Sequence, residues 1–164
     1  MDNSKKTKRK ILVTQALPYA NAPLHLGHIL EAVQTDIWTR FQNFNGNECL
    51  FFCADDTHGT PVMLKANEMG IKPEELISDV YKDHKSSYEL YGINFANFYS
   101  THSDENRKYS EYIYECAKNN NLISKANVEQ YYDEKEEMFL SDRFIKGTCP
   151  KCDAEDQNGD NCGV

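Results

Sequence analysis

The stretch ILVTQALPYANAPLHLGH, residues 11–28, joins a short apolar run, a loop bounded by prolines and the start of a helix. The run from Ile11 to Ala16 predicts a buried strand. The segment from Pro18 to Leu24 holds two prolines, which interrupt strand hydrogen bonding, so it predicts a shaped loop. Apolar residues then recur every three or four positions and predict one buried face of a helix that ends near Asn45–Gly46, namely Leu26, Leu30, Val33, Ile37 and Phe41.

A second apolar run, Cys49 to Ala54, follows this helix and is closed by Asp55 and Asp56. A strand, loop, helix and strand in this order are typical of a parallel sheet in an α/β fold. Ligands of such sheets bind at the carboxyl ends of the strands. The loop and the aspartate pair are therefore expected at one edge of the sheet.

The chain after the aspartate pair predicts further helices and a third strand. We expect a short helix from Pro61 to Gly70, a longer one from Pro73 to Gly92, and a strand from Phe98 to Thr101. Ser103 is expected to cap another helix that runs to Asn119–Asn121. The short apolar pieces beyond it predict hairpin strands of an inserted module.

Charge is distributed unevenly along the chain, whose formal net charge is -8. Residues 1–10 carry the basic cluster and are expected to form a disordered tail, with Lys5, Lys6, Lys8, Arg9 and Lys10. The remaining chain is acidic and offers a poor surface for phosphates, so most of the basic surface needed for a nucleic acid must lie elsewhere. No apolar stretch approaches the length of a membrane span, and we expect a cytoplasmic protein without a membrane partner.

His25-Leu26-Gly27-His28 places two imidazoles three positions apart at the first turn of the predicted helix. Free backbone N–H groups and the positive end of the helix dipole attract phosphate there, and two imidazoles add hydrogen-bond donors. Gly27 lets a flat ring approach the backbone closely. The pattern predicts a site for a nucleotide triphosphate, whereas two ordinary surface or core histidines are the alternative for the motif taken alone.

Several motifs in one order resemble the methionyl-tRNA synthetases. The resemblance is carried by residues 16–21 (ALPYAN), 25–28 (HLGH), 53–61 (CADDTHGTP), 100–103 (STHS) and 142–150 (DRFIKGTCP). The two histidines match the His-Ile-Gly-His signature of class I aminoacyl-tRNA synthetases, with leucine in place of isoleucine. The resemblance covers nearly everything from Ile11 to Val164 and identifies the chain as an N-terminal fragment of that family.

The resemblance implies roles for individual residues. His25 and His28 would bind the ATP phosphates and stabilise the transition state, and Asp56 would hold the amino group of methionine. The remaining ATP-binding residues would be Asn21 and Gly27, and the remaining methionine-binding residues would be Ala16, Leu17 and Tyr19. The reaction implied is attack of the methionine carboxylate on the α-phosphate of Mg-ATP, which releases pyrophosphate, followed by transfer to tRNA(Met).

The neighbouring polar residues allow simpler interpretations. Asp55 is about as suited to cap the helix near Pro61 as to bind a ligand, whereas Asp56 suits the capping role less. Single histidines are usually structural, so His58, His84 and His102 are predicted to have no functional role.

Cys149 and Cys152 form a CxxC turn, and Cys162 follows after a polar stretch. Zinc takes four tetrahedral ligands, usually from two such turns, so the three thiols predict an incomplete structural zinc knuckle that water or Asp160 would close. A redox pair is the alternative, but it normally stands at a helix N-terminus beside a strand. In the resembled family, this knuckle lies in an insertion between the halves of a Rossmann-like catalytic domain, which implies residues 11–102 for the first half and 103–164 for the insertion.

Two elements of class I synthetases are not found among the 164 residues. No Lys-Met-Ser-Lys-Ser stretch is present, and neither is a helical anticodon-binding domain. We therefore expect no adenylate formation by this chain alone, marginal stability and exposed apolar surface. A binding module without catalysis is one alternative, and a class I enzyme for leucine, valine, isoleucine or cysteine is another, because apolar pockets discriminate weakly.

Overall fold

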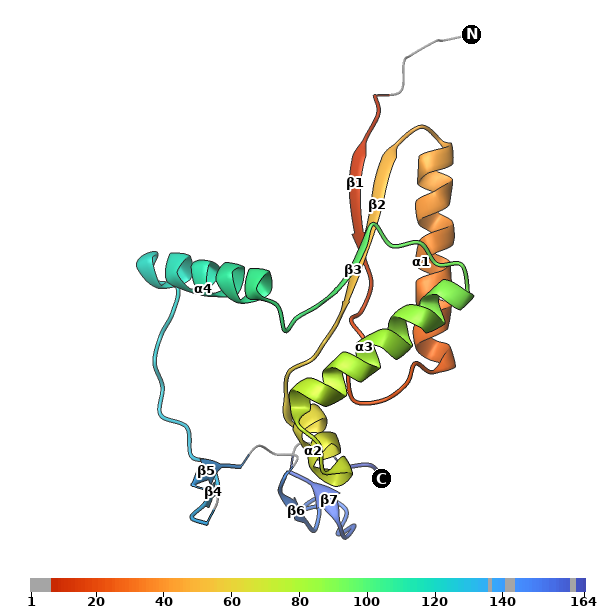
Figure 1. Cartoon of the computed structure of the whole chain (residues 1–164). Helices are drawn as coiled ribbons and strands as arrows, with labels where there is room; N and C mark the ends of the chain where they lie inside the picture. Colours follow the sequence, from red (N-terminus) through yellow and green to blue (C-terminus); the bar gives the residue numbers. More distant parts are fainter. Residues whose placement is uncertain (1–6, 136, 141–143, 160–161) are drawn as a thin grey trace. The chain divides into compact units, whose positions relative to one another are not determined.

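The structure, a computed structural model, describes residues 7–135, 137–140, 144–159 and 162–164 (Figure 1). The chain packs as two units, Met1–Tyr112 and Ile113–Val164, each with its own internal contacts. Predictions made for Lys5, Lys6, Asp142, Arg143 and Asp160 lie outside the described residues. The assignment of residues 103–164 to an inserted module remains a prediction.

The first unit is built on a parallel sheet of three strands. The strands are β1 (Lys10–Thr14), β2 (Glu48–Asp55) and β3 (Asn97–Ser100), in the spatial order β1-β2-β3. Val13 pairs with Phe51, and Cys53 pairs with Phe98. The predicted parallel arrangement is confirmed, although β1 ends two residues earlier than expected.

Side chains of β2 alternate between the two faces of the sheet, as they must in any strand. Cys49, Phe51, Cys53 and Asp55 are buried, whereas Leu50 on the other face is exposed. Leu12 of β1 is likewise 70% exposed. Apolar residues on both faces are typical of parallel sheets that are covered on both sides. The described residues cover one face, so the expected exposed apolar surface is present.

Helix α1 (Leu26–Phe44) follows the loop and lies beside β2 (Figure 1). The helix was predicted correctly, but its buried face was not. Of the five residues predicted for that face only Val33 packs against the core, whereas Leu26, Leu30, Ile37 and Phe41 are exposed. The helix instead buries Ile29, Ala32, Asp36 and Thr39.

The buried face of α1 has the same helical spacing as the predicted one, but two of its members are polar. Asp36 accepts a hydrogen bond from the backbone N–H of Asn94 and pairs with Arg40, while the Thr39 hydroxyl donates to the carbonyl of Thr35 at 2.8 Å. These bonds satisfy the buried polar groups. A prediction based on apolar residues alone does not detect such bonds and therefore misses this face.

Two further helices complete the first unit. Helix α2 (Thr60–Met69) ends at Gly70, which adopts the left-handed conformation with φ 67°, and helix α3 (Pro73–Leu90) carries Glu74 and Glu75 in its first turn. Both match the predicted spans. The two helices pack together around a small cluster of Ala20, Val62, Ala66, Leu76 and Ile77.

The main core lies between the sheet and helices α1 and α3. Tyr88 of α3 packs edge-on against Phe98 of β3, with ring centroids 5.5 Å apart. The ring centroids of Phe51 and Phe95 are 4.6 Å apart. The other buried members of this core are Ile29, Ala32, Cys53 and Ile93. Both helices thus cover the same face of the sheet.

Helix α4 (Asp104–Asn119) is capped by Ser103, whose hydroxyl accepts from the backbone N–H of Asn106 at 3.1 Å. The second unit then contains two short antiparallel pairs. β4 (Tyr132–Asp133) pairs with β5 (Met138–Phe139), and β6 (Lys146–Gly147) pairs with β7 (Gln157–Asn158). Hairpin strands were predicted near Tyr131–Tyr132, Met138–Leu140 and Phe144–Ile145; the first two are confirmed, whereas the third strand begins one residue later, at Lys146. None of the helices in the described part is long and apolar enough to cross a membrane.

A matched pair of phenylalanines tests this core. Phe51 is 1% exposed and Phe44 is 90% exposed. Phe51→Ala should lower the free energy of unfolding by about 3–5 kcal/mol, or unfold the chain, because it removes a fully buried ring. Phe44→Ala should change it by no more than about 0.5 kcal/mol. Urea unfolding followed by circular dichroism measures both, and similar losses for the two variants would contradict this packing.

Candidate functional site

The loop after β1 meets the end of β2 through main-chain hydrogen bonds. The N–H of Asp56 donates to the carbonyl of Pro18 at 2.8 Å, and the N–H of Ala20 donates to the carbonyl of Asp56 at 2.9 Å. Tyr19 and Asp56 thereby form an isolated parallel bridge. The two segments expected at one sheet edge are adjacent in the structure.

His25 and His28 form the start of α1. The Nδ1 atom of His25 accepts from the N–H of Gly27 at 3.1 Å, and the Nδ1 atom of His28 accepts from the N–H of His25 at 3.2 Å. This is a reciprocal capping box in which both caps are imidazoles. Their rings are stacked, with centroids 3.7 Å apart.

These bonds define what the rings can offer to a ligand. Because each Nδ1 accepts a hydrogen bond, a neutral ring must carry its proton on Nε2, and each Nε2–H is then a donor. Burial lowers the pKa of His28, and the neighbouring His25 and His84 rings lower it further. The N–H of Gly27, one of the backbone donors of this first turn, donates to His25.

A side chain at position 27 would crowd the ring of His25. A Cβ atom at this position would lie 2.9 Å from the Cε1 atom of His25. A larger residue at this position would displace the His25 ring from its capping position, a consequence that the motif alone did not indicate.

Asp55 and Asp56 are in different environments because successive side chains of a strand point to opposite faces. Asp55 is fully buried, and its Oδ1 atom lies 2.8 Å from Nδ1 of His84. Gly59 is the N-cap of α2, so the capping interpretation of the aspartates was wrong. Asp56 is half-buried and, within the described part of the chain, its carboxylate has no hydrogen-bond partner.

The other residues predicted for the site lie along the loop. Leu17 and Tyr19 are 41% and 52% exposed, and Asn21 is half-buried. The backbone N–H of Ala16 donates to Oε1 of Glu31 on α1 at 2.9 Å, which ties the start of the loop to that helix. The ligand-binding roles of these residues remain predictions.

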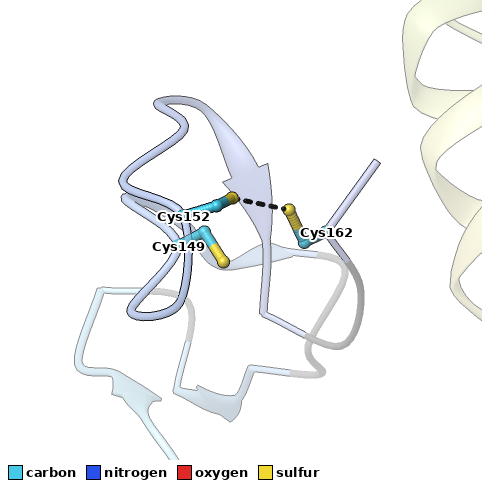
Figure 2. Close-up of side chains that lie close together, drawn as sticks. All are labelled: Cys149, Cys152 and Cys162. Atoms are coloured by element: carbon cyan, nitrogen blue, oxygen red, sulfur yellow. Dashed lines mark hydrogen bonds between the residues drawn. The ribbon is translucent and has the colours of Figure 1, made fainter. Parts of the chain in front are cut away.

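In the second unit, Cys149, Cys152 and Cys162 come together (Figure 2). Their sulfur atoms lie within 4.8 Å of one another, and those of Cys152 and Cys162 are 3.5 Å apart. Tetrahedral zinc with bonds of about 2.3 Å requires sulfurs about 3.8 Å apart, whereas a disulfide requires about 2.05 Å. Hydrogen bonds from the backbone at Lys151 and Cys152 lower the pKa of Cys149 to about 7, which favours the thiolate that a metal needs. The cluster fits three positions of a metal site.

Comparison with known proteins agrees with this arrangement. A family model described as tRNA synthetases class I (M) matches residues 11–164. The chain belongs to this methionyl-tRNA synthetase family. It is 59% identical over 156 residues to the methionine–tRNA ligases of two Leptospira biflexa serovar Patoc strains, and this match covers 95% of the chain. The chain spans 23% of the length of those relatives.

Solved structures show the same class I synthetase fold. Mycobacterium tuberculosis methionyl-tRNA synthetase in complex with methionyl-adenylate superimposes with a TM-score of 0.74 at 21% identity, covering 92% of this chain and 30% of that one. The LeuRS of Agrobacterium radiobacter, in a ternary complex with tRNA and LeuAMS, superimposes with a TM-score of 0.71 at 22% identity. The match covers 94% of this chain and 20% of that one. At such identities the likeness concerns the fold alone.

Three histidines that the sequence analysis left without a role make specific contacts in this synthetase chain. His84 is buried against Asp55. The Nε2 atom of His58 lies 3.2 Å from the Nδ1 atom of His102. The second pair borders a hollow of about 600 Å³ at the start of α4. Of these contacts, only that between His58 and His102 could have been expected from the sequence. The two residues come just after β2 and β3, and the ends of neighbouring parallel strands lie close together.

The cysteine cluster makes a direct prediction about metal binding. Cys149→Ser and Cys152→Ser should each weaken Co²⁺ binding at least about 100-fold, because each removes a thiolate ligand. Cys116→Ser is the matched control, since Cys116 is exposed on α4 and outside the cluster. The thiolate charge-transfer absorption of Co²⁺ measures binding. Equal binding by the cluster variants and the control would contradict a metal site here.

Proposed function

We propose that this chain carries the methionine and ATP site of a methionine–tRNA ligase, which activates methionine to methionyl-adenylate and transfers it to tRNA(Met) for translation initiation and elongation. The main-chain pairing of Asp56 with Pro18 and Ala20 supports the proposal most directly, because it brings the loop and the aspartate to one place. Family membership supports the chemistry. Transfer of the methionyl group to tRNA and binding of the tRNA phosphates would depend on sequence outside these 164 residues.

Methionine would bind between the loop and the end of β2. The carboxylate of Asp56 is the proposed partner of the substrate ammonium group, because carboxylates form strong hydrogen bonds to ammonium groups and this one has no protein partner among the described residues. Ala16, Leu17 and Tyr19 would line the pocket. Their exposure in this structure is consistent with side chains that a ligand would cover.

ATP would bind at the start of α1. The Nε2–H groups of His25 and His28 are proposed to donate to the phosphates, with Asn21 and Gly27 nearby on the same loop and helix start. As the methionine carboxylate attacks the α-phosphorus of Mg-ATP, negative charge grows on the phosphate oxygens, and fixed donors stabilise it more than they stabilise the ground state. The P–O bond to the leaving pyrophosphate breaks, and no covalent bond to the protein forms.

The three cysteines would hold a structural Zn²⁺, with water or Asp160 as the fourth ligand. Bound zinc would cross-link the β6–β7 hairpin and the chain end beside it, in a unit whose strands have only two residues each. In the domain organisation we propose, residues 11–102 are half of the catalytic domain and 103–164 belong to the connective insertion. We propose a cytoplasmic location, in keeping with reduced thiols.

Methionine binding tests the role of Asp56. Isothermal titration calorimetry should detect methionine binding to the 164-residue chain, and Asp56→Asn should weaken it about 10–100-fold by removing a charged hydrogen bond. Asp79→Asn is the control, because Asp79 is an exposed residue of α3 paired with Lys82. Leucine, isoleucine, valine and cysteine are titrated in parallel. Tighter binding of one of these would overturn the assignment to methionine.

Catalysis is expected to be absent from these residues alone. The Lys-Met-Ser-Lys-Ser stretch, whose lysines complete the ATP site in the family, does not occur in them. The purified chain should therefore show no methionine-dependent ATP–pyrophosphate exchange above background. Methionine binding without exchange would favour the binding-module interpretation for this chain, and exchange at a useful rate would show that the stretch is dispensable.

A further inference from the structure

His84 of α3 is enclosed between two hydrogen-bond acceptors. Its ring is 0% exposed, its Nδ1 lies 2.8 Å from Oδ1 of Asp55, and its Nε2 lies 2.8 Å from the carbonyl oxygen of Ala22. A carbonyl oxygen can only accept, and so can an ionised carboxylate. Both acceptors are satisfied only if both ring nitrogens carry protons.

The proton in the hydrogen bond between His84 and Asp55 can belong to either residue. A neutral ring with a protonated Asp55 would make the same two bonds, but the intrinsic pKa values of histidine and aspartate differ by about 2.5 units in favour of the protonated ring. The second oxygen of Asp55, Oδ2, is buried without a partner. His84 is thus the only side chain that bonds to this carboxylate among the described residues, and its two hydrogen bonds favour a protonated ring.

The pair joins three elements at the proposed site. Asp55 precedes Asp56 at the end of β2, Ala22 belongs to the loop that leads to His25, and His84 comes from α3. One ring thus holds the loop against the strand end from the buried side. On the opposite side, the loop is held by the main-chain bonds of Asp56.

We propose that His84 is a positioning residue, which as an imidazolium fixes the loop against β2 and balances the buried carboxylate of Asp55 beside Asp56. The part that concerns methionine rests on the proposed function. In that function, a fixed loop keeps the residues proposed to line the methionine pocket next to Asp56. His84 does not itself touch the ligand in this proposal.

The electrostatic environment supports the charged ring. Burial disfavours the charge, but the hydrogen bonds to Asp55 and Ala22 outweigh it, so the pKa of His84 is raised above its ordinary value. Asp83 on the same helix adds to this shift, and His28 on α1 is the nearby group of like charge when protonated. With a raised folded-state pKa, the stabilisation by this ring is complete below the ordinary histidine pKa and is lost as the pH rises through the raised value.

Nuclear magnetic resonance of the 164-residue chain tests the state of the ring. With ¹⁵N-labelled histidine, both ring nitrogens of His84 should carry slowly exchanging protons from about pH 6 to about pH 7. His84→Gln identifies the signals by their loss. A ring nitrogen without a proton at about pH 6 would overturn the proposal, and this outcome does not depend on whether methionine binds.

Amide exchange and binding test the positioning role. His84→Gln should speed exchange of the amides of Ala20 and Asp56 at least about 10-fold and weaken methionine binding by a similar factor, while circular dichroism stays that of a folded chain. Lys85→Gln removes a positive charge from an exposed position of the same helix and should change neither. The double variant Asp55→Asn/His84→Gln removes the unbalanced buried charge and should fold, but it should keep the faster amide exchange and the weaker methionine binding, because the imidazolium that holds the loop is absent.

The outcomes separate this inference from the proposed function. If the parent chain fails to bind methionine, the proposed function fails for these residues. The role of His84 is then still tested by the protonation state of its ring and by the amide exchange rates. Unchanged exchange and unchanged affinity in a folded His84→Gln variant would overturn the positioning role. If that variant unfolds, the folded double variant and the ring signals of the parent chain decide instead. Parent-like exchange and affinity in the double variant would overturn the positioning role.

Discussion

Parallel pairing of β1 with β2 is the constraint on which the site depends. Parallel strands bring their carboxyl ends to the same edge, so whatever follows each strand must meet there. The pairing resumes beyond the strands, where Asp56 bonds to Pro18 and Ala20 through the main chain. The loop that leads to His25 and His28 therefore starts beside Asp56. Side chains decide what binds at this edge, but backbone hydrogen bonds bring them together.

The elements of the fold could be predicted because their signals are local. The apolar run of β2, the glycine that ends α2 and the Pro-Glu-Glu start of α3 each act within a few residues, and the structure has them as expected. The buried face of α1 could not be chosen in this way. Two faces of that helix share the same spacing, and the one that packs includes Asp36 and Thr39, whose burial depends on partners such as Asn94 far along the chain.

The candidate site was predictable where it follows from strand ends and a helix start, and unpredictable where it depends on long-range contacts. The motif placed His25 and His28 at the start of α1, but it did not show that their Nδ1 atoms cap the helix and leave Nε2–H as the donor. His84 was treated as an ordinary histidine. Its partner Asp55 lies 29 positions away, and no local pattern links them. Only the tertiary fold turns this histidine and this aspartate into a buried pair.

Burial divides neighbouring residues of the same type into different roles. Asp55 and Asp56 are adjacent, yet the alternation of a strand sends one side chain into the helix layer and leaves the other half-buried. A buried carboxylate without a partner would be costly, so the fold provides His84 for Asp55. Asp56 needs no such partner because water, or a ligand, can reach it. One strand thus places one aspartate in the core and leaves the next at the sheet edge, where it is accessible.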